Sequence, residues 1–209
     1  MSNFLLLFFS NFYPKMFGYF VKFILKFKNI KIGKNFSAFN FPIIIVDKTS
    51  QIIFGDNVKL FGVVEVRATR GSKVYIYNDV KIDKCVRILV TNNSTLKIKD
   101  KTGIGAFTII NSGDDCVIGT NCMISSSVQI QCSSHNFDNA SSNIVDQGYS
   151  HKKITIGDDV WIGSKATILM GSVIKNKVVI GAHSLVKGTI EEKSVVAGTP
   201  AKLIKKRIS

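Results

Sequence analysis

Branched aliphatic residues return at every sixth position along most of this chain. Between residues 154 and 186 the sixth position is always isoleucine or valine, at Ile156, Ile162, Ile168, Ile174, Ile180 and Val186. An amphipathic α-helix would repeat its apolar positions every three or four residues, and a half-buried strand every two. A period of six instead indicates a short strand followed by a turn, repeated many times.

The same spacing occurs in three earlier registers, which are Ile76, Ile82, Ile88, then Ile98, Ile104, Ile110, then Ile118, Ile124, Ile130. A second position, four residues after the first, carries small or β-branched side chains. Three six-residue faces would close a triangular coil of about eighteen residues, and stacked coils would share one core. The pattern is less regular before residue 74, so we expect irregular first coils there.

The period is interrupted once, between Ile130 and Ile156. The intervening sequence is rich in Ser, Asn and Asp, so we expect a loop, residues 133–153, that leaves the prism. The solenoid is predicted to span residues 30–200. A basic C-terminal tail, residues 201–209, is expected to follow it.

Residues 1–29 form a different segment, dense in Phe and Leu. From Pro14 onward they fit an amphipathic helix, with one stripe of Lys15, Lys22 and Lys26 opposite Phe17, Phe20, Ile24 and Phe27. The run Phe4–Phe9 is too short to cross a bilayer. Either the helix lies in a membrane interface with its lysines toward anionic headgroups, or it covers the open first coil or a neighbouring subunit. The two interpretations are compatible.

The charge of the chain indicates an anionic partner. With 28 basic and 14 acidic residues among 209, the net charge is +14, which suits a membrane surface or a phosphate-bearing cofactor. No nucleic-acid-binding motif is present and the lysines are spread along the chain, so we do not expect nucleic acid as a partner. The four cysteines form no CxxC pair and no histidine cluster accompanies them, so we expect no metal site but small buried thiols in a reducing cytosol.

Three segments resemble a known family. "ITIGDDVWIGSKATILMGSVI", "VVIGAHSLV" and "VVAGTPAKLIKKR" resemble the hexapeptide-repeat acyltransferases, in the branch that contains the maltose and galactoside acetyltransferases and the bacterial polysaccharide O-acetyltransferases. The resemblance extends from about Cys116 to Arg207. It implies an all-β, left-handed parallel β-helix with a short N-terminal helical segment. It also implies a homotrimer that binds acetyl-CoA between adjacent prisms, the loop of one subunit reaching toward its neighbour.

The candidate catalytic residues are His135 and Trp161. Transfer of an acetyl group to a hydroxyl needs a base, and imidazole suits this near neutral pH. His135 opens the loop, where the family has its catalytic histidine, although Asn136 stands where a proline is usual. In the matching motif, Trp161 lines the channel beside the pantetheine arm and the acetyl group. The alternatives are a solvated loop histidine and a tryptophan that packs against the loop.

The resemblance also carries over candidate coenzyme A contacts. Ser164 and Ala182 would act mainly through backbone groups along the pantetheine, and Lys202 and Lys205 would meet the phosphates. Lys187 stands where the sugar acetyltransferases often have threonine, and it is a further candidate phosphate contact. For the lysines the alternative is a solvated surface position.

These features lead us to expect an acetyl-CoA-dependent O-acetyltransferase of a carbohydrate hydroxyl, acting in bacterial surface polysaccharide modification. We expect it in the cytoplasm, peripheral to the inner face of the membrane. Two alternatives stay open. One is N-acetylation of an amino-sugar nucleotide, and the other is a non-catalytic solenoid that binds a partner through its faces.

Overall fold

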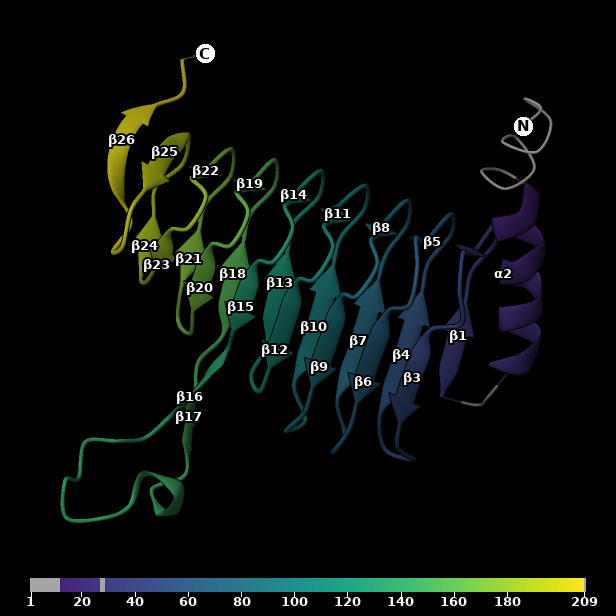
Figure 1. Ribbon diagram of the computed structural model, residues 1–209, viewed down its shortest axis with the longest axis horizontal. Coiled ribbons are helices and arrows are strands. Elements are labelled where there is room, and N and C mark those ends of the chain that lie inside the picture. Colours follow the sequence, from purple (N-terminus) through teal and green to yellow (C-terminus); the bar gives the residue numbers. More distant parts are fainter. Residues whose placement is uncertain (1–11, 27–28, 209) are drawn as a thin grey trace.

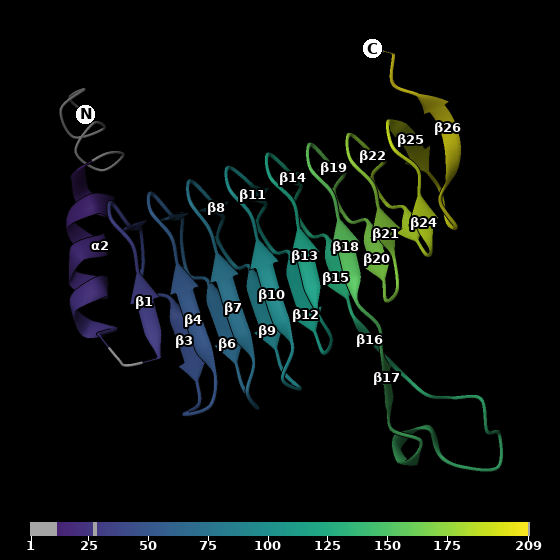
Figure 2. The ribbon, with the colours of Figure 1, turned by 180° about the vertical axis from the view of Figure 1, so that it is seen from behind.

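The described chain folds into a parallel β-solenoid preceded by one helix (Figures 1 and 2). The computed structural model describes residues 12–26 and 29–208, and the remaining residues, 1–11, 27–28 and 209, lie outside it. The expectations for Phe4–Phe9 and Phe27 therefore fall outside the described residues. The all-β solenoid with a short N-terminal helix is confirmed.

Three sheets form the sides of the prism, and each coil contributes one strand to each sheet. Sheet A contains β1 (Ile30–Ile32), β4 (Gln51–Phe54), β7 (Lys73–Ile76), β10 (Thr95–Ile98), β13 (Cys116–Ile118), β18 (Ile154–Ile156), β21 (Val173–Ile174) and β24 (Thr189–Ile190). Sheet B contains β2 (Ser37–Ala38), β5 (Lys59–Leu60), β8 (Lys81–Ile82), β11 (Gly103–Ile104), β14 (Met123–Ile124), β19 (Trp161–Ile162), β22 (Val179–Ile180), β25 (Ser194–Ala197) and β26 (Lys202–Lys206). Sheet C contains β3 (Ile43–Val46), β6 (Glu65–Ala68), β9 (Arg87–Val90), β12 (Ile109–Ser112), β15 (Gln129–Gln131), β20 (Thr167–Leu169) and β23 (Leu185–Val186).

The sixth-position residues point into the prism and stack on one another. On sheet C, Val66, Ile88, Ile110, Ile130 and Ile168 occupy the same register on successive parallel strands. All five are fully buried. Since parallel strands lie about 4.8 Å apart, each aliphatic side chain contacts its counterpart in the next coil. The hexad pattern therefore identified the core correctly.

The expected coil length is wrong for the N-terminal half. The Asp56 N–H donates to Asn78 Oδ1 at 2.8 Å across 22 residues, and the same bond from Asp158 to Asn176 spans 18 residues at 2.8 Å. The first coils are therefore as regular as the later ones, but longer. The estimate of eighteen residues counted three faces and no insertion at a corner.

The additional residues lie at the corner that leads from sheet C to sheet A. Its sequence is DKTS, TRGS and TNNS in three successive coils. Ser72 is buried, its N–H donates to Ser50 Oγ at 3.0 Å, and its hydroxyl donates to the Thr69 carbonyl at 2.7 Å. This recurring polar corner closes each long coil and satisfies its own buried polar groups.

Helix α2 (Tyr13–Ile24) covers the open end of the first coil. Pro14, Gly18 and Val21 are its buried residues, and the ring of Phe17 meets that of Phe41 edge-on at 5.8 Å. A Cβ on Gly18 would collide with the carbonyl oxygen of Phe36. The capping interpretation is therefore what the structure shows. The described part of the chain contains no helix with the length and hydropathy to cross a membrane.

The other end of the solenoid is closed differently. Strand β26 (Lys202–Lys206) turns back and pairs antiparallel with β25 (Ser194–Ala197), opposite the parallel direction of the other pairs in sheet B. The basic C-terminal segment is thus largely a strand.

Replacing Gly18 by alanine tests the helix cap. In an isolated helix alanine is favoured over glycine by about 1 kcal/mol, whereas overpacking typically costs about 1–3 kcal/mol. We expect Gly18→Ala to lower the denaturant midpoint of unfolding followed by circular dichroism. Tyr19→Ala, at the exposed position next to Gly18, is expected to change the free energy of unfolding by less than about 0.5 kcal/mol. A midpoint raised by Gly18→Ala would show that α2 does not pack on the coil.

Thiol labelling tests the core. Cys116, Cys122 and Cys132 are buried, and Cys85 is exposed. Burial raises the pKa of the Cys122 thiol to about 11. The group therefore stays protonated near neutral pH, and the protonated thiol is unreactive. We expect one thiol per chain to react quickly with an aromatic disulfide reagent, and the other three only after unfolding. Rapid reaction of all four in native buffer is the contrary result.

Candidate active site

The long interruption of the hexad forms an arm that leaves the prism. Strands β16 (Ser133–His135) and β17 (Tyr149–His151) pair antiparallel at its base, and the 3-10 helix η2 (Ile144–Asp146) lies in its outer part. Both views show the arm on the side of the prism away from the strands of sheet B (Figures 1 and 2). The predicted loop therefore has a rigid two-stranded stem.

His135 lies at the end of β16, exposed to solvent. Its ring lies 4.1 Å from that of Tyr149, its register partner on β17, at an interplanar angle of 39°. The imidazole makes no hydrogen bond or ion pair with any residue that the structure describes, Asp138 included. Tyr149 therefore positions this histidine through ring packing, and both ring nitrogens stay available.

His151 holds the same stem against the prism. Its Nδ1 lies 2.8 Å from Ser133 Oγ and its Nε2 lies 3.3 Å from Asn92 Nδ2. Because an amide nitrogen can only donate, Nε2 accepts, which places the ring proton on Nδ1, where it donates to Ser133. The His151 ring also stacks with Tyr149 at 6.2 Å and 13°. Tyr149 thus lies between a fixed histidine and a free one.

Sequence reasoning did not single out Tyr149 or His151 as positioning residues. The available signal was the segment "YSH" at the return of the loop, which mirrors "SSH" at its start. Their pairing depends on the register of the stem, which the sequence pattern does not reveal.

Trp161 lies on β19, in sheet B. Its indole is half exposed, with 50% of its surface accessible. The indole N–H donates to Ser125 Oγ at 3.1 Å, so the ring is held over the preceding coil. Met123 and Val179 are its register neighbours on either side.

The predicted coenzyme A contacts continue from Trp161 toward the C-terminus. The register of sheet B runs from Trp161 to Val179, Val195 and Lys205 on successive strands. Three strand spacings amount to about 14 Å. An extended ligand that starts at the indole can therefore reach the Lys205 ammonium along the surface of the sheet.

Two further predicted contacts lie at the corner that leads from sheet B to sheet C. Ser164 and Ala182 occupy this corner in successive coils, where the His183 N–H donates to the Ser164 carbonyl at 2.9 Å. Lys202 faces Ala197 across the β25–β26 pair. The structure thus brings five predicted residues, from Trp161 to Lys205, to one side of the prism.

His135 and Lys187 lie elsewhere. Both follow strands of sheet C, at the corner that leads to sheet A. No hydrogen bond or ring contact joins His135 to Trp161. In one copy of the described chain the predicted site residues are therefore divided between two places. The two parts of the site occupy different sides of the prism.

The described residues contain no group of three His, Cys, Asp or Glu side chains arranged to hold a metal ion. His135 and His151 share the stem of the arm, whereas His183 lies at a corner beyond Ser164.

The sequence matches several curated acetyltransferases. No protein-family model matches the chain. A probable acetyltransferase of Mycobacterium tuberculosis is 34% identical over 116 residues, 56% of this chain and 39% of that protein. WbbJ of Escherichia coli K12, an inferred O-acetyl transferase of lipopolysaccharide biosynthesis, is 53% identical over 53 residues, 25% of this chain and 27% of that protein. A chloramphenicol acetyltransferase of Klebsiella aerogenes is 32% identical over 146 residues, 64% of this chain and 63% of that protein. The chain thus spans less than two thirds of each of these relatives.

Solved structures share the fold. A variant of AntD, an N-acyltransferase from Bacillus cereus in complex with dTDP and coenzyme A, superposes with a TM-score of 0.59 at 20% identity, covering 91% of this chain and 89% of that one. The polysialic acid O-acetyltransferase OatWY gives a TM-score of 0.55 at 24% identity, covering 85% and 88%.

Fold and repeats define the chain as a hexapeptide-repeat β-solenoid. The sequence matches confirm its resemblance to the acetyltransferases of that family.

Proposed function

We propose that this chain is an acetyl-CoA-dependent O-acetyltransferase that acts on a carbohydrate hydroxyl. The observation that carries the proposal is a free imidazole on a rigid stem, together with a row on sheet B that leads from Trp161 to Lys205. The match to WbbJ supports a hydroxyl as the acceptor. A surface polysaccharide or its lipid-linked precursor is the acceptor we favour.

His135 acts as the base in the proposed reaction. An imidazole nitrogen takes the proton of the acceptor hydroxyl while that oxygen bonds to the thioester carbonyl carbon. The resulting tetrahedral oxyanion collapses, the carbon–sulfur bond breaks, and the leaving thiolate receives the proton from the imidazolium. The products are an acetyl ester and free coenzyme A, and His135 returns to its neutral state.

Trp161 lies at the reacting end of the donor. Its indole N–H is held by Ser125, so the ring face rather than the N–H is presented to the acetyl group and the pantetheine. Lys202 and Lys205 on β26 meet the phosphates of coenzyme A as point charges. Ser164 and Ala182 lie between these ends and offer backbone groups.

The site is completed by a second copy of the chain. His135 and Trp161 lie on different sides of one prism, so we infer that the arm of one subunit meets sheet B of its neighbour. Lys187, on the corner that carries the arm, would then approach the donor from the same subunit as His135. A homotrimer of parallel prisms supplies this arrangement three times.

Mixing two impaired variants tests this assembly. We expect His135→Ala to lower turnover by about 10²–10⁴-fold and Trp161→Ala to weaken the use of acetyl-CoA, both measured as free thiol release with hydroxyl acceptors. Because each site draws on two chains, co-refolded mixtures of the two variants regain some intact sites and part of the activity.

Three outcomes would contradict parts of this proposal. Full turnover by His135→Ala overturns the mechanism. Inactive mixtures of two folded variants overturn the shared site. Turnover with amine acceptors and none with hydroxyls replaces O-acetylation by N-acetylation.

Helix α2 supports a second element of the proposal, peripheral contact with an anionic membrane. Its buried face covers the first coil, yet Met16, Tyr19 and Phe23 on the outward face are 52%, 67% and 76% exposed. At about 100° per residue these three lie within about 60° of one another. Lys15 and Lys22 lie next to this face, on its Tyr19 side, and are exposed, with Lys22 Nζ donating to the Gly33 carbonyl at 2.8 Å. Exposed aromatic residues beside lysines suit the interface of an anionic bilayer.

Vesicle flotation tests the membrane contact. We expect the chain to float with phosphatidylglycerol–phosphatidylcholine vesicles and less with phosphatidylcholine alone. The double change Tyr19→Ser and Phe23→Ser should weaken binding by at least about tenfold, because each buried aromatic contributes roughly 1.5–3 kcal/mol. Phe107→Ser with Val173→Ser is the matched control on other faces. Equal flotation of both double variants would refute the proposal.

A further inference from the structure

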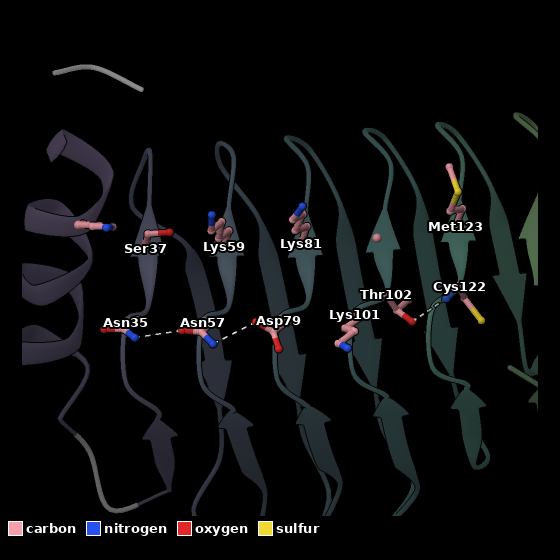
Figure 3. Close-up of a pocket in the computed structure, with 12 residues that line it drawn as sticks. Asn35, Ser37, Asn57, Lys59, Asp79, Lys81, Lys101, Thr102, Cys122 and Met123 are labelled. Carbon is pink, nitrogen blue, oxygen red and sulfur yellow. Dashed lines mark hydrogen bonds between the residues drawn. The ribbon is translucent and has the colours of Figure 1, made fainter. Parts of the chain in front are cut away.

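A groove of about 840 Å³ lies on the outer face of sheet B, on the N-terminal side of Trp161 (Figure 3). It begins beside helix α2, where Lys15 lines it, and ends at Met123 on β14. It therefore crosses strands β2, β5, β8, β11 and β14, a distance of about 19 Å at the usual strand spacing.

The groove leads to the candidate active site. Met123 is the register neighbour of Trp161. A second hollow of about 250 Å³ shares Lys81, Gly103 and Met123 with the groove and reaches Ser125, whose hydroxyl accepts the Trp161 indole N–H. The predicted coenzyme A contacts run from Trp161 toward the C-terminus, so this groove lies on the opposite side of the tryptophan.

A glycine forms part of its floor, next to the Met123 end. Along this row of sheet B the outward residues are Lys59, Lys81, Gly103 and Met123 in successive coils. A Cβ on Gly103 would meet no atom within 4 Å, and its backbone is not in the left-handed region. Neither the turn nor the packing requires glycine here. What it provides is space in the groove, one strand before Met123.

The charge in the groove is not neutralised. Lys15, Lys59, Lys81 and Lys101 line it with one carboxylate, Asp79, and none of these lysines forms an ion pair with a described residue. Lys59 and Lys81 are direct register neighbours, a placement that costs stability for like charges.

Four basic side chains elsewhere on the described solenoid have acidic partners. Arg87 pairs with Glu65 at 2.8 Å, and Lys175 pairs with Glu191 at 2.6 Å. Asp79 is itself held by Asn57, whose Nδ2 donates to its Oδ1 at 3.0 Å, as Figure 3 shows. The four lysines that line the groove therefore present free positive charge to a ligand.

We propose that this groove binds the acceptor, and that the acceptor is an acidic glycan chain. Carboxylates or phosphates along the chain contact Lys59, Lys81 and Lys101, while one of its hydroxyls reaches the acetyl group beside Trp161. The groove is longer than a single sugar ring, which favours an oligomer over a monosaccharide. This inference rests on the proposed acetyl transfer at Trp161.

Binding measurements without acetyl-CoA test the groove directly. The probes are a fluorescent oligogalacturonate, which carries one carboxylate per sugar, and a neutral maltodextrin of equal length. We expect the full chain to prefer the acidic oligomer and to lose that preference at high salt. The change Lys59→Gln with Lys81→Gln should weaken acidic binding by about tenfold or more.

Two further variants sharpen the test. Lys31→Gln with Lys73→Gln removes the same charge from exposed positions on sheet A and should leave binding within about twofold of the unmodified chain. Gly103→Phe fills the groove without changing charge, and should weaken glycan binding while coenzyme A binding stays unchanged.

The outcomes separate the groove from the reaction. The groove is not the acceptor site if the two lysine double variants weaken glycan binding equally. It is also not the acceptor site if Lys59→Gln/Lys81→Gln and Gly103→Phe both leave glycan binding unchanged. Either result holds even where thiol release still depends on His135. A change in sedimentation on altering Lys59 and Lys81 also overturns the groove as acceptor site, because the groove is then a subunit contact. If the chain binds the acidic oligomer selectively but transfers acetyl to no acceptor, the groove is a glycan-binding site and the proposed reaction is refuted.

Discussion

The structure depends on the in-register stacking of successive coils. Most strands have only two to four residues, too few to be stable alone. Each is held by backbone hydrogen bonds to the coils before and after it, and by aliphatic side chains that stack inside the prism. Once the inward residues are aligned, the outward residues of every sheet are aligned as well. The rows that contain Lys59, Lys81, Trp161 and Lys205 are thus a direct consequence of how the core packs.

The core could be predicted from sequence because a fully buried stack tolerates few residue types. Every sixth position must be aliphatic, and that restriction is visible. The corners are less restricted, so the number of residues in a coil could not be read from the hexad. The step from Ile88 to Ile98 showed an insertion, but its regularity became clear only from bonds such as that between Asp56 and Asn78. Helix α2 was ambiguous for another reason, because it carries aromatic residues on more than one face.

The candidate site was predicted in its parts but not in its arrangement. His135 and Trp161 were identified from motifs, and their roles remain predictions. The resemblance implied that the loop of one subunit reaches toward its neighbour, but the motifs alone did not show on which side of the prism each residue lies. The positioning roles of Tyr149 and His151, and the basic groove, were not predicted for a related reason. Their neighbours come from other coils or from across the arm, as with Asn92 and His151.

The two closed ends have a consequence for how copies of the chain can associate. Open solenoid ends expose unpaired strand edges, which invite another chain to add on and extend the sheet into a fibre. Here α2 blocks one end, and the reversed strand β26 occupies the other in sheet B. Growth along the axis is therefore disfavoured, and contacts between copies are directed to the flanks of the prism. Side-by-side association is also the geometry that would let the arm of one copy reach the indole of another.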